Sequence, residues 1–186
     1  MLFPLDNKYT GLLTISGPSK SGKSKLAEFL IKNQDSVTYI ATSKPRHEDP
    51  EWQRRVKVHK KRRPNSWKVI EYPLDICKYI ESMSRHESIL IDSLGGLVEQ
   101  YLMLNNKKWE VFQNSLIDCL RTNDYSVIVI VVEEISWGIV PSTPIGHLYR
   151  ERLCHLAALI NIYSSRKWLA VQGNAIDLDK IGFRIP

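Results

Sequence analysis

Short apolar runs alternate along this chain with longer segments whose apolar residues recur at helical spacing. The short runs carry few charges, as do strands that are buried on both faces of a sheet. They predict strands at residues 12–16, 37–43, 67–72, 88–93, 125–134 and, as the last strand of the chain, 167–173. Helices are predicted at residues 23–33, 50–63, 74–84, 94–104, 109–121 and 144–164. This alternation indicates an α/β fold with a mainly parallel sheet and helices on both faces.

Length and composition favour a single domain that spans residues 1–186. The chain shows no internal repeat and no linker, and no apolar run approaches the roughly 20 residues that a membrane-spanning helix needs. Its three cysteines are widely spaced and match no metal-binding pattern. The N-terminal stretch lacks the pattern of a signal peptide, so we expect a cytoplasmic protein with reduced thiols and no membrane span.

The strongest motif is GPSKSGKS, which fills every required position of the phosphate-binding loop (P-loop) pattern G-x-x-x-x-G-K-S/T. It follows a predicted strand and opens a predicted helix, where backbone N–H groups converge on phosphate. Lys23 is expected to reach the β- and γ-phosphates of a nucleotide, and Ser24 to hold Mg²⁺. The candidate residues are Gly17, Pro18, Ser19, Lys20, Ser21, Gly22, Lys23 and Ser24. Together with the strand pattern, the motif predicts a three-layer P-loop NTPase fold.

A P-loop site needs a second acid on the metal side, at the end of another buried strand. Asp92, in the sequence ILIDS, fits this position. Its alternative role is to cap the helix that follows, which Ser93 can also do. A dinucleotide site is not expected, because the chain contains no G-x-G-x-x-G.

The net charge of +6 comes from one short segment. Residues 44–68 hold ten Lys and Arg against three acids, so the rest of the chain is close to neutral. A local cluster suits a phosphate-rich small ligand at least as well as a long polyanion. The basic residues are not interleaved with aromatic ones and no RNA or DNA motif is present, so no nucleic-acid partner is expected.

His59 lies within this basic segment, in the sequence EWQRRVKVHKKRRPNSW. Asp49 is placed to cap a helix that begins at Pro50, and Pro64 ends that helix. Helical spacing predicts one face formed by Trp52, Val56, His59 and Arg63. The histidine is therefore expected on or beside the face that points inward.

Arg55 and Arg62 flank His59 at helical spacing. Nearby positive charge lowers the pKa of an imidazole and so favours its neutral, nucleophilic form. The same cations would neutralise the oxygens of a phosphate under attack, which fits a phosphohistidine-type intermediate. On spacing alone, a packing or solvated histidine is the plainer alternative. The other histidines lack such a setting and are expected to be structural: His47, His86, His147 and His155.

Five segments occur in an order that resembles a known family. They are GPSKSGKS, YIATS, RRVKVHKKRRPNSW, ILIDSLG and WGIVPSTPIGHLYRERL, and the resemblance covers nearly the whole chain, from residue 12 to about 177. The chain is similar to the bifunctional adenosylcobinamide kinase / adenosylcobinamide-phosphate guanylyltransferase of cobalamin (vitamin B12) biosynthesis. The most specific part is R-V/I-x-x-H-K/R-x-x-R-P-x-x-W, present here from Arg55 to Trp67.

The resemblance implies a two-step activity on a corrinoid substrate, adenosylcobinamide. A kinase step would phosphorylate its aminopropanol hydroxyl with ATP or GTP and Mg²⁺. His59 would attack the α-phosphate of GTP and carry GMP, which then passes to the new phosphate to give adenosylcobinamide-GDP. The nucleotide pocket implied by the family comprises the P-loop with Ala41, Thr42, Ser43, Lys60, Lys61, Arg62, Arg63, Glu71 and Asp92, with Ser24 and Asp92 on the metal. The family also implies a homo-oligomer, a trimer.

The chain departs from the family pattern after two strands. The family often shows N-E-V-G-x-G-I-V-P, where this chain has Glu133 for Asn and Ser136 for the first Gly. In the family, the acid after ILI is often followed by Cys and Thr, whereas this chain has Ser93 and Gly95. In the helix after the second motif, Cys154, Ala157 and Ala158 replace an expected glycine and an N-Q pair. None of these departures falls within the P-loop motif or replaces His59.

Three other hypotheses stay open at this point. A plain P-loop small-molecule kinase or NTPase would need Lys23 but not His59. A nucleotide-dependent nucleic-acid-binding protein would use the basic helix, and its binding would fall steeply with salt. A degenerate family member would bind nucleotide without turnover.

Overall fold

The computed structural model describes residues 9–84, 86–121 and 127–185. Within these residues, seven strands form one sheet in the order β3-β2-β4-β5-β1-β6-β7. All neighbouring strands are parallel except the pair β6–β7. The strands are β1 (Gly11–Gly17), β2 (Val37–Ala41), β3 (Lys68–Glu71), β4 (Ser88–Asp92), β5 (Val127–Glu133), β6 (Arg166–Val171) and β7 (Asn174–Asp177). The predicted α/β fold with a mainly parallel sheet is confirmed.

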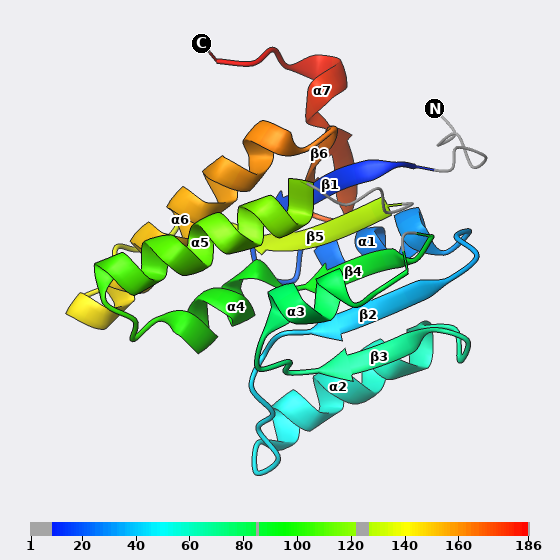
Figure 1. The fold of residues 1–186 in the computed structure, drawn as a ribbon, viewed down its shortest axis with the longest axis horizontal. Helices are drawn as coiled ribbons and strands as arrows, with labels where there is room; N and C mark the ends of the chain where they lie inside the picture. Colours follow the sequence, from blue (N-terminus) through cyan, green and yellow to red (C-terminus); the bar gives the residue numbers. More distant parts are fainter. Residues whose placement is uncertain (1–8, 85, 122–126, 186) are drawn as a thin grey trace.

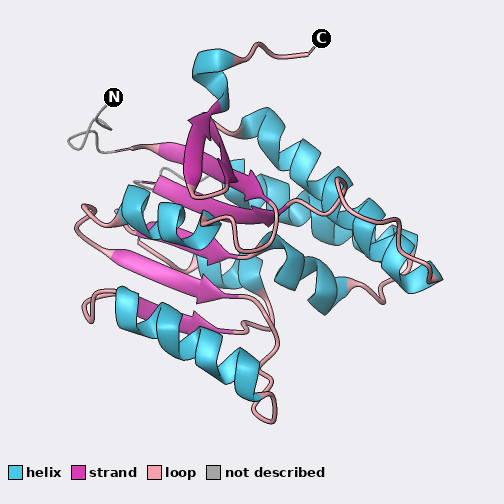
Figure 2. Cartoon of the chain, turned by 180° about the vertical axis from the view of Figure 1, so that it is seen from behind, coloured by secondary structure: helices cyan, strands magenta, loops and turns pink. Residues whose placement is uncertain are grey.

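Helices cover both faces of this sheet. They are α1 (Lys23–Ile31), α2 (Pro50–Arg62), α3 (Ile76–Glu81), α4 (Leu94–Tyr101), α5 (Asn106–Arg121), α6 (Pro144–Tyr163) and the short α7 (Leu178–Ile181). Helices α3, α4, α5 and α6 lie on one face (Figure 1), while α1 and α2 lie on the other, which is seen from behind (Figure 2). Two apolar cores result, one between the sheet and α3–α6 and one between the sheet and α1.

The end of the chain differs from the prediction. Residues 167–173 were expected to form the last strand, but β6 turns back at Gln172 and Gly173 into the antiparallel β7. Both turn residues have positive φ, as a two-residue hairpin turn requires. β7 has only four residues, which is too short a run for the sequence pattern to predict a strand. At the start of the strand predicted at residues 125–134, Tyr125 and Ser126 lie outside the described residues.

The parallel register brings the C-terminal ends of five strands to one edge. Ala41 of β2 is level with Glu71 of β3 and with Asp92 of β4. On the other side of β4, Glu133 ends β5 and is level with Gly17, which ends β1 and begins the P-loop. Ligands of open α/β sheets bind at this edge, so the fold gathers the predicted site residues there.

Candidate nucleotide site

The P-loop lies close against β6, the strand next to β1 in the sheet. Gly17 has a φ of 150°, and a Cβ built on it would lie 2.1 Å from the carbonyl oxygen of Ala170 in β6. The N–H of Gly173 donates to the Ser21 carbonyl at 3.3 Å. Only glycine therefore fits at position 17, because any side chain would meet the backbone of β6.

Two polar groups of the loop have hydrogen-bonding capacity that a ligand can use. The Ser21 Oγ is buried and has no hydrogen-bond partner among the described residues. The Lys23 Nζ donates to the Pro18 carbonyl at 2.7 Å, which a bound phosphate can replace. Burial lowers the pKa of Lys23, while the carboxylates of Glu133 and Asp92 raise it. The loop lysine is thus close to both acids at the ends of β5 and β4.

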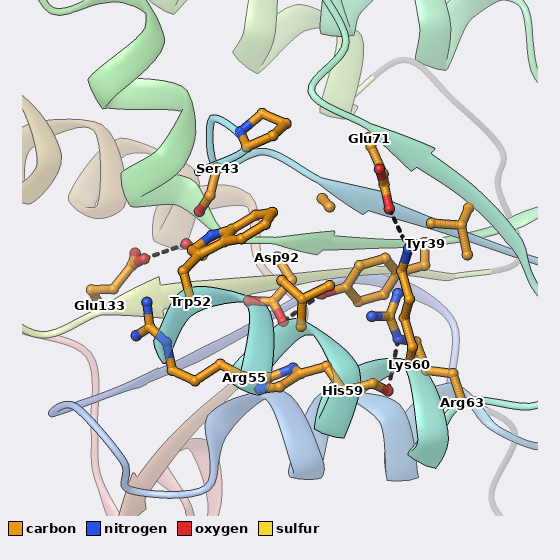
Figure 3. Close-up of a pocket in the computed structure, with 15 residues that line it drawn as sticks. Tyr39, Ser43, Trp52, Arg55, His59, Lys60, Arg63, Glu71, Asp92 and Glu133 are labelled. Atoms are coloured by element: carbon orange, nitrogen blue, oxygen red, sulfur yellow. Dashed lines mark hydrogen bonds and ion pairs between the residues drawn. The ribbon is translucent and has the colours of Figure 1, made fainter. Parts of the chain in front are cut away.

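Beside the loop lies a cavity of about 240 Å³ between α2 and the ends of β2–β5. Figure 3 shows its side chains converging from these elements. Its lining comprises Tyr39, Ala41, Ser43, Pro45, Trp52, Arg55, Val56, His59, Lys60, Arg63, Val69, Glu71, Asp92, Ser93 and Glu133. The predicted inward face of the basic helix is confirmed, because all four of its residues line this cavity.

Helix α2 begins as predicted. The Asp49 carboxylate caps it by accepting from the N–H groups of Glu51 and Trp52 at 2.9 and 3.0 Å, and Pro50 is its first residue. The helix buries none of its own residues. Its position on the molecule therefore depends on contacts made by long polar side chains rather than on an apolar face.

His59 is half-buried in the cavity wall. Its pKa is lowered mainly by burial, and Arg62, Arg63 and Arg55 lower it further against an opposing effect of Asp92. The Arg62 Nη2 lies 3.4 Å from the His59 Nδ1. The predicted direction of the shift agrees with this environment, although burial and not the cations has the larger effect.

The four basic residues that follow His59 lie in four different settings. Lys60 reaches the Glu71 carboxylate at 3.0 Å, and Arg62 forms two bonds of 3.1 Å with Glu28 of α1. The Arg63 guanidinium stacks on Tyr39 at 3.7 Å from the ring centroid. Lys61 does not line this cavity and lies instead at a neighbouring hollow along α2.

A chain of polar contacts joins the C-terminal end of α2 to β2 and β4. Arg63 donates from Nε to the His59 carbonyl at 3.1 Å, and its Nη1 is buried without a partner among the described residues. The Tyr39 hydroxyl beneath it donates to the Asp92 carboxylate at 2.9 Å. A buried guanidinium N–H without a partner is costly, so this corner of the cavity suits an anionic ligand.

The residues after β2 divide between lining and support. Ala41 and Ser43 line the cavity, whereas Thr42 is fully buried below it. The Thr42 hydroxyl donates to the Ser93 carbonyl at 2.6 Å and accepts from the Ser93 N–H at 2.7 Å. Thr42 therefore fixes the β2 end against the β4 end rather than facing the cavity.

Ser24 and Asp92 offer the donor set expected for Mg²⁺. Magnesium is usually held by one or two protein oxygens together with phosphate oxygens and water. Asp92 lines the cavity with its carboxylate near the loop lysine, and Ser24 stands at the start of α1. Among the described residues no group of three His, Cys, Asp or Glu side chains is placed to hold a metal.

Sequence reasoning did not assign a role to three residues that shape this site: Glu28, Tyr39 and Glu133. Glu133 was noted only as a departure from the family pattern, yet it ends a buried parallel strand just as Asp92 does. The rule that selected Asp92 therefore also pointed to Glu133. Glu28 and Tyr39 gave no such signal, because their partners are far away in the sequence.

The fold and the site define a nucleotide-binding P-loop protein. The chain resembles the structure of a prototypical ATPase from the type III secretion system of pathogenic bacteria, with a TM-score of 0.54. That match has 12% identity and covers 94% of this chain and 59% of the other, so it concerns the fold alone.

The sequence narrows the class to one family. Residues 13–178 match the family model described as cobinamide kinase / cobinamide phosphate guanyltransferase, and the chain belongs to this family. It is 24% identical to the bifunctional adenosylcobalamin biosynthesis protein CobU of Escherichia coli (strain K12), over 90% of this chain and 99% of that protein. It is 30% identical to the bifunctional adenosylcobalamin biosynthesis protein CobP of Pseudomonas aeruginosa, over 73% of this chain and 78% of that protein.

Proposed function

We propose that this protein phosphorylates adenosylcobinamide with ATP or GTP and then transfers GMP from GTP to the product through His59. The end product is adenosylcobinamide-GDP, an intermediate of cobalamin biosynthesis. One observation carries the proposal: a half-buried histidine, flanked by arginines, lines a cavity at the same sheet edge as an intact P-loop. Membership of the family supports the choice of substrate.

For the kinase step, Gly17–Ser24 would cradle the phosphates of the nucleotide through backbone N–H groups and Lys23. Ser24 and Asp92 would hold Mg²⁺, which offsets charge on the phosphates when it is bound. The Ser21 hydroxyl would gain the hydrogen-bond partner that it lacks, and the Lys23 ammonium would exchange the Pro18 carbonyl for a phosphate oxygen.

For the transfer step, the neutral imidazole of His59 would attack the α-phosphorus of GTP. A P–N bond forms, and the bond to the departing pyrophosphate breaks. Arg63, with its unpartnered N–H, and Lys60 would neutralise phosphate oxygens. An oxygen of the cobinamide phosphate would then attack the same phosphorus and release His59.

The test is covalent labelling with GTP radiolabelled at the α-phosphate, in the presence of Mg²⁺. The wild type should retain label after denaturation, lose it in acid and keep it in alkali, as a phosphoramidate does. The His59→Ala variant should take up no label. His47→Ala is a matched control, because His47 is exposed just before the same helix and should label like the wild type.

Absence of label on folded wild-type protein would overturn the transfer step. A plain P-loop kinase or NTPase would then be the better assignment, since it needs Lys23 but not His59.

A homotrimer is the assembly we propose from the family resemblance, and analytical ultracentrifugation tests it. No helix in the described parts of the chain is long and apolar enough to cross a membrane, and we propose that the reaction takes place in the cytoplasm.

A further inference from the structure

The loop between β5 and α6, residues 134–143, exposes large apolar side chains. Trp137 is 64% exposed, Ile139 96% and Val140 59%. Ile145, in the first turn of α6, is exposed as well. A single exposed apolar residue is normal, but several along one short segment are typical of a surface that binds a ligand or a partner. We call the segment from Trp137 to Val140 the apolar loop.

Hydrogen bonds hold the chain on both sides of the apolar loop. The Ser136 N–H donates to the Glu134 carboxylate at 2.7 Å, and the Arg150 guanidinium donates to the Ser136 carbonyl at 2.8 Å. Thr143 caps α6 by accepting from the Gly146 N–H at 3.2 Å. The exposed side chains therefore project from an anchored segment, which lowers the entropy cost of binding to them.

The segment that carries the apolar loop begins beside the P-loop. Glu133, the last residue of β5, is level with Gly17, and Glu134 donates its N–H to the Gly17 carbonyl at 2.9 Å. Figure 1 shows α6 beginning (yellow) beyond the arrowheads of the strands. The chain from β5 to α6 therefore crosses the edge of the sheet at which the proposed nucleotide site lies.

The proposed substrate is too large for the cavity beside His59. That cavity has a volume of about 240 Å³, whereas pockets that enclose drug-sized ligands measure roughly 300–1,000 Å³. Adenosylcobinamide is larger than such a ligand, because its corrin ring carries amide side chains, an adenosyl group and the aminopropanol arm. Only the arm has to reach the γ-phosphate, so the ring has to lie on the surface near the P-loop.

Two segments flank the P-loop and differ in character. The turn of the β6–β7 hairpin, which contacts the P-loop through the Gly173 N–H, exposes Gln172, Gly173 and Asn174. It offers no large apolar side chain. The segment after β5 offers three, and the rim of a corrin ring is rich in methyl groups that gain from apolar contact.

We propose that the apolar loop binds the corrin ring of the substrate while the aminopropanol arm reaches the P-loop. The inference rests on the function proposed above. Trp137 would give the ring a flat aromatic contact, and Ile139 and Val140 would cover methyl groups at its rim. Burial of these exposed side chains would supply the free energy of binding.

The experiment measures the Kd of cobinamide by equilibrium dialysis, which needs no turnover. The double variant Trp137→Ser/Ile139→Ser should raise this Kd about tenfold, because it removes most of the apolar contact. The KM for cobinamide should rise in parallel, while kcat at saturating cobinamide stays within about threefold. Labelling of His59 by α-labelled GTP and the Kd of a non-hydrolysable ATP analogue should also stay within about threefold.

Phe183→Ser/Ile185→Ser is the matched control. These two side chains are 90% and 86% exposed, but they lie in the C-terminal segment after α7. The control should bind cobinamide like the wild type. If the variant of the apolar loop does not fold, Ile139→Ser alone serves instead, because this side chain is almost fully exposed, and it should raise the Kd about fivefold.

The inference is overturned if the folded variant binds cobinamide within twofold of the wild type. It is also overturned if the Kd of the ATP analogue rises equally, or if analytical ultracentrifugation shows a smaller assembly, because the apolar loop would then be a contact between copies of the chain. A wild type that binds the ATP analogue but no cobinamide would instead refute the corrinoid substrate of the proposed function.

Discussion

The P-loop and helix α2 are the two regions that we propose to bind phosphate, yet they are built in opposite ways. The P-loop offers mostly backbone groups to a ligand and lies close against β6, where a Cβ on Gly17 would be 2.1 Å from the Ala170 carbonyl oxygen. Helix α2 consists of charged side chains, buries none of its own residues, and is tied down by Arg62–Glu28, Lys60–Glu71 and Arg63–Tyr39. The phosphate cradle that we propose is therefore made of backbone, whereas the nucleophile that we propose is carried on a helix held by side-chain contacts.

The largest effect is expected from two substitutions that separate the phosphorylation step from the GMP-transfer step. Lys23→Met should lower phosphorylation of cobinamide by about 10²–10⁴-fold, because it removes the charge that stabilises the transferred phosphoryl group. His59→Asn should leave phosphorylation within about threefold and abolish labelling by α-labelled GTP. Initial rates of both reactions measure this. Equal loss of phosphorylation in the two variants would mean that the regions do not act separately.

A second prediction concerns the packing of the P-loop. Gly17→Ala should lower the free energy of unfolding by about 2–4 kcal/mol, because the new Cβ meets the Ala170 carbonyl in an otherwise close-packed sheet. Gly173→Ala is the control: its φ is also positive, at 78°, but nothing described lies within 4 Å of the added Cβ. It should cost only about 1 kcal/mol. Urea unfolding compares them, and similar losses would contradict a steric origin.

A third prediction concerns the tether between α2 and α1. A double-mutant cycle with Arg62→Met and Glu28→Gln should give a coupling energy of about 1–2 kcal/mol, because the pair is bidentate and Glu28 is buried. The exposed pair Arg46–Glu99, at 3.4 Å, should couple by less than about 0.5 kcal/mol. Arg62→Met should also slow labelling of His59 by about 3–10-fold through loss of alignment. Equal coupling in the two pairs would show that α2 is not held by this contact.

The smallest expected effect is on the pH dependence of labelling. The pKa of His59 is lowered from its ordinary value, first by burial and then by its arginine neighbours. The neutral imidazole therefore persists at a lower pH, and the rate should fall to half only below pH 6.5. Arg55→Gln removes one cation, so the pKa should rise and the midpoint should move to higher pH. A midpoint that moves to lower pH would contradict this account.

The same contrast explains which parts of the molecule could be predicted from the sequence. The P-loop, the cap at Asp49 and the inward face of α2 are local patterns, and the structure has each of them where it was expected. The partners of α2 could not be predicted. Glu28 is 34 residues from Arg62, and only the folded sheet brings them together. Likewise, no local pattern showed that Thr42 would turn below the cavity while its neighbours line it.

Among the described residues, the strand that presents the P-loop pairs only with strands from the second half of the sequence. β1 pairs with β5 on one side and with β6 on the other, so its hydrogen bonding is completed only by residues 127–171. During synthesis the N-terminal part emerges from the ribosome first, so this strand must wait until residues 127–171 have been made. Such distant pairing slows folding. We therefore expect nucleotide to stabilise the P-loop only once residues 127–171 have joined the sheet.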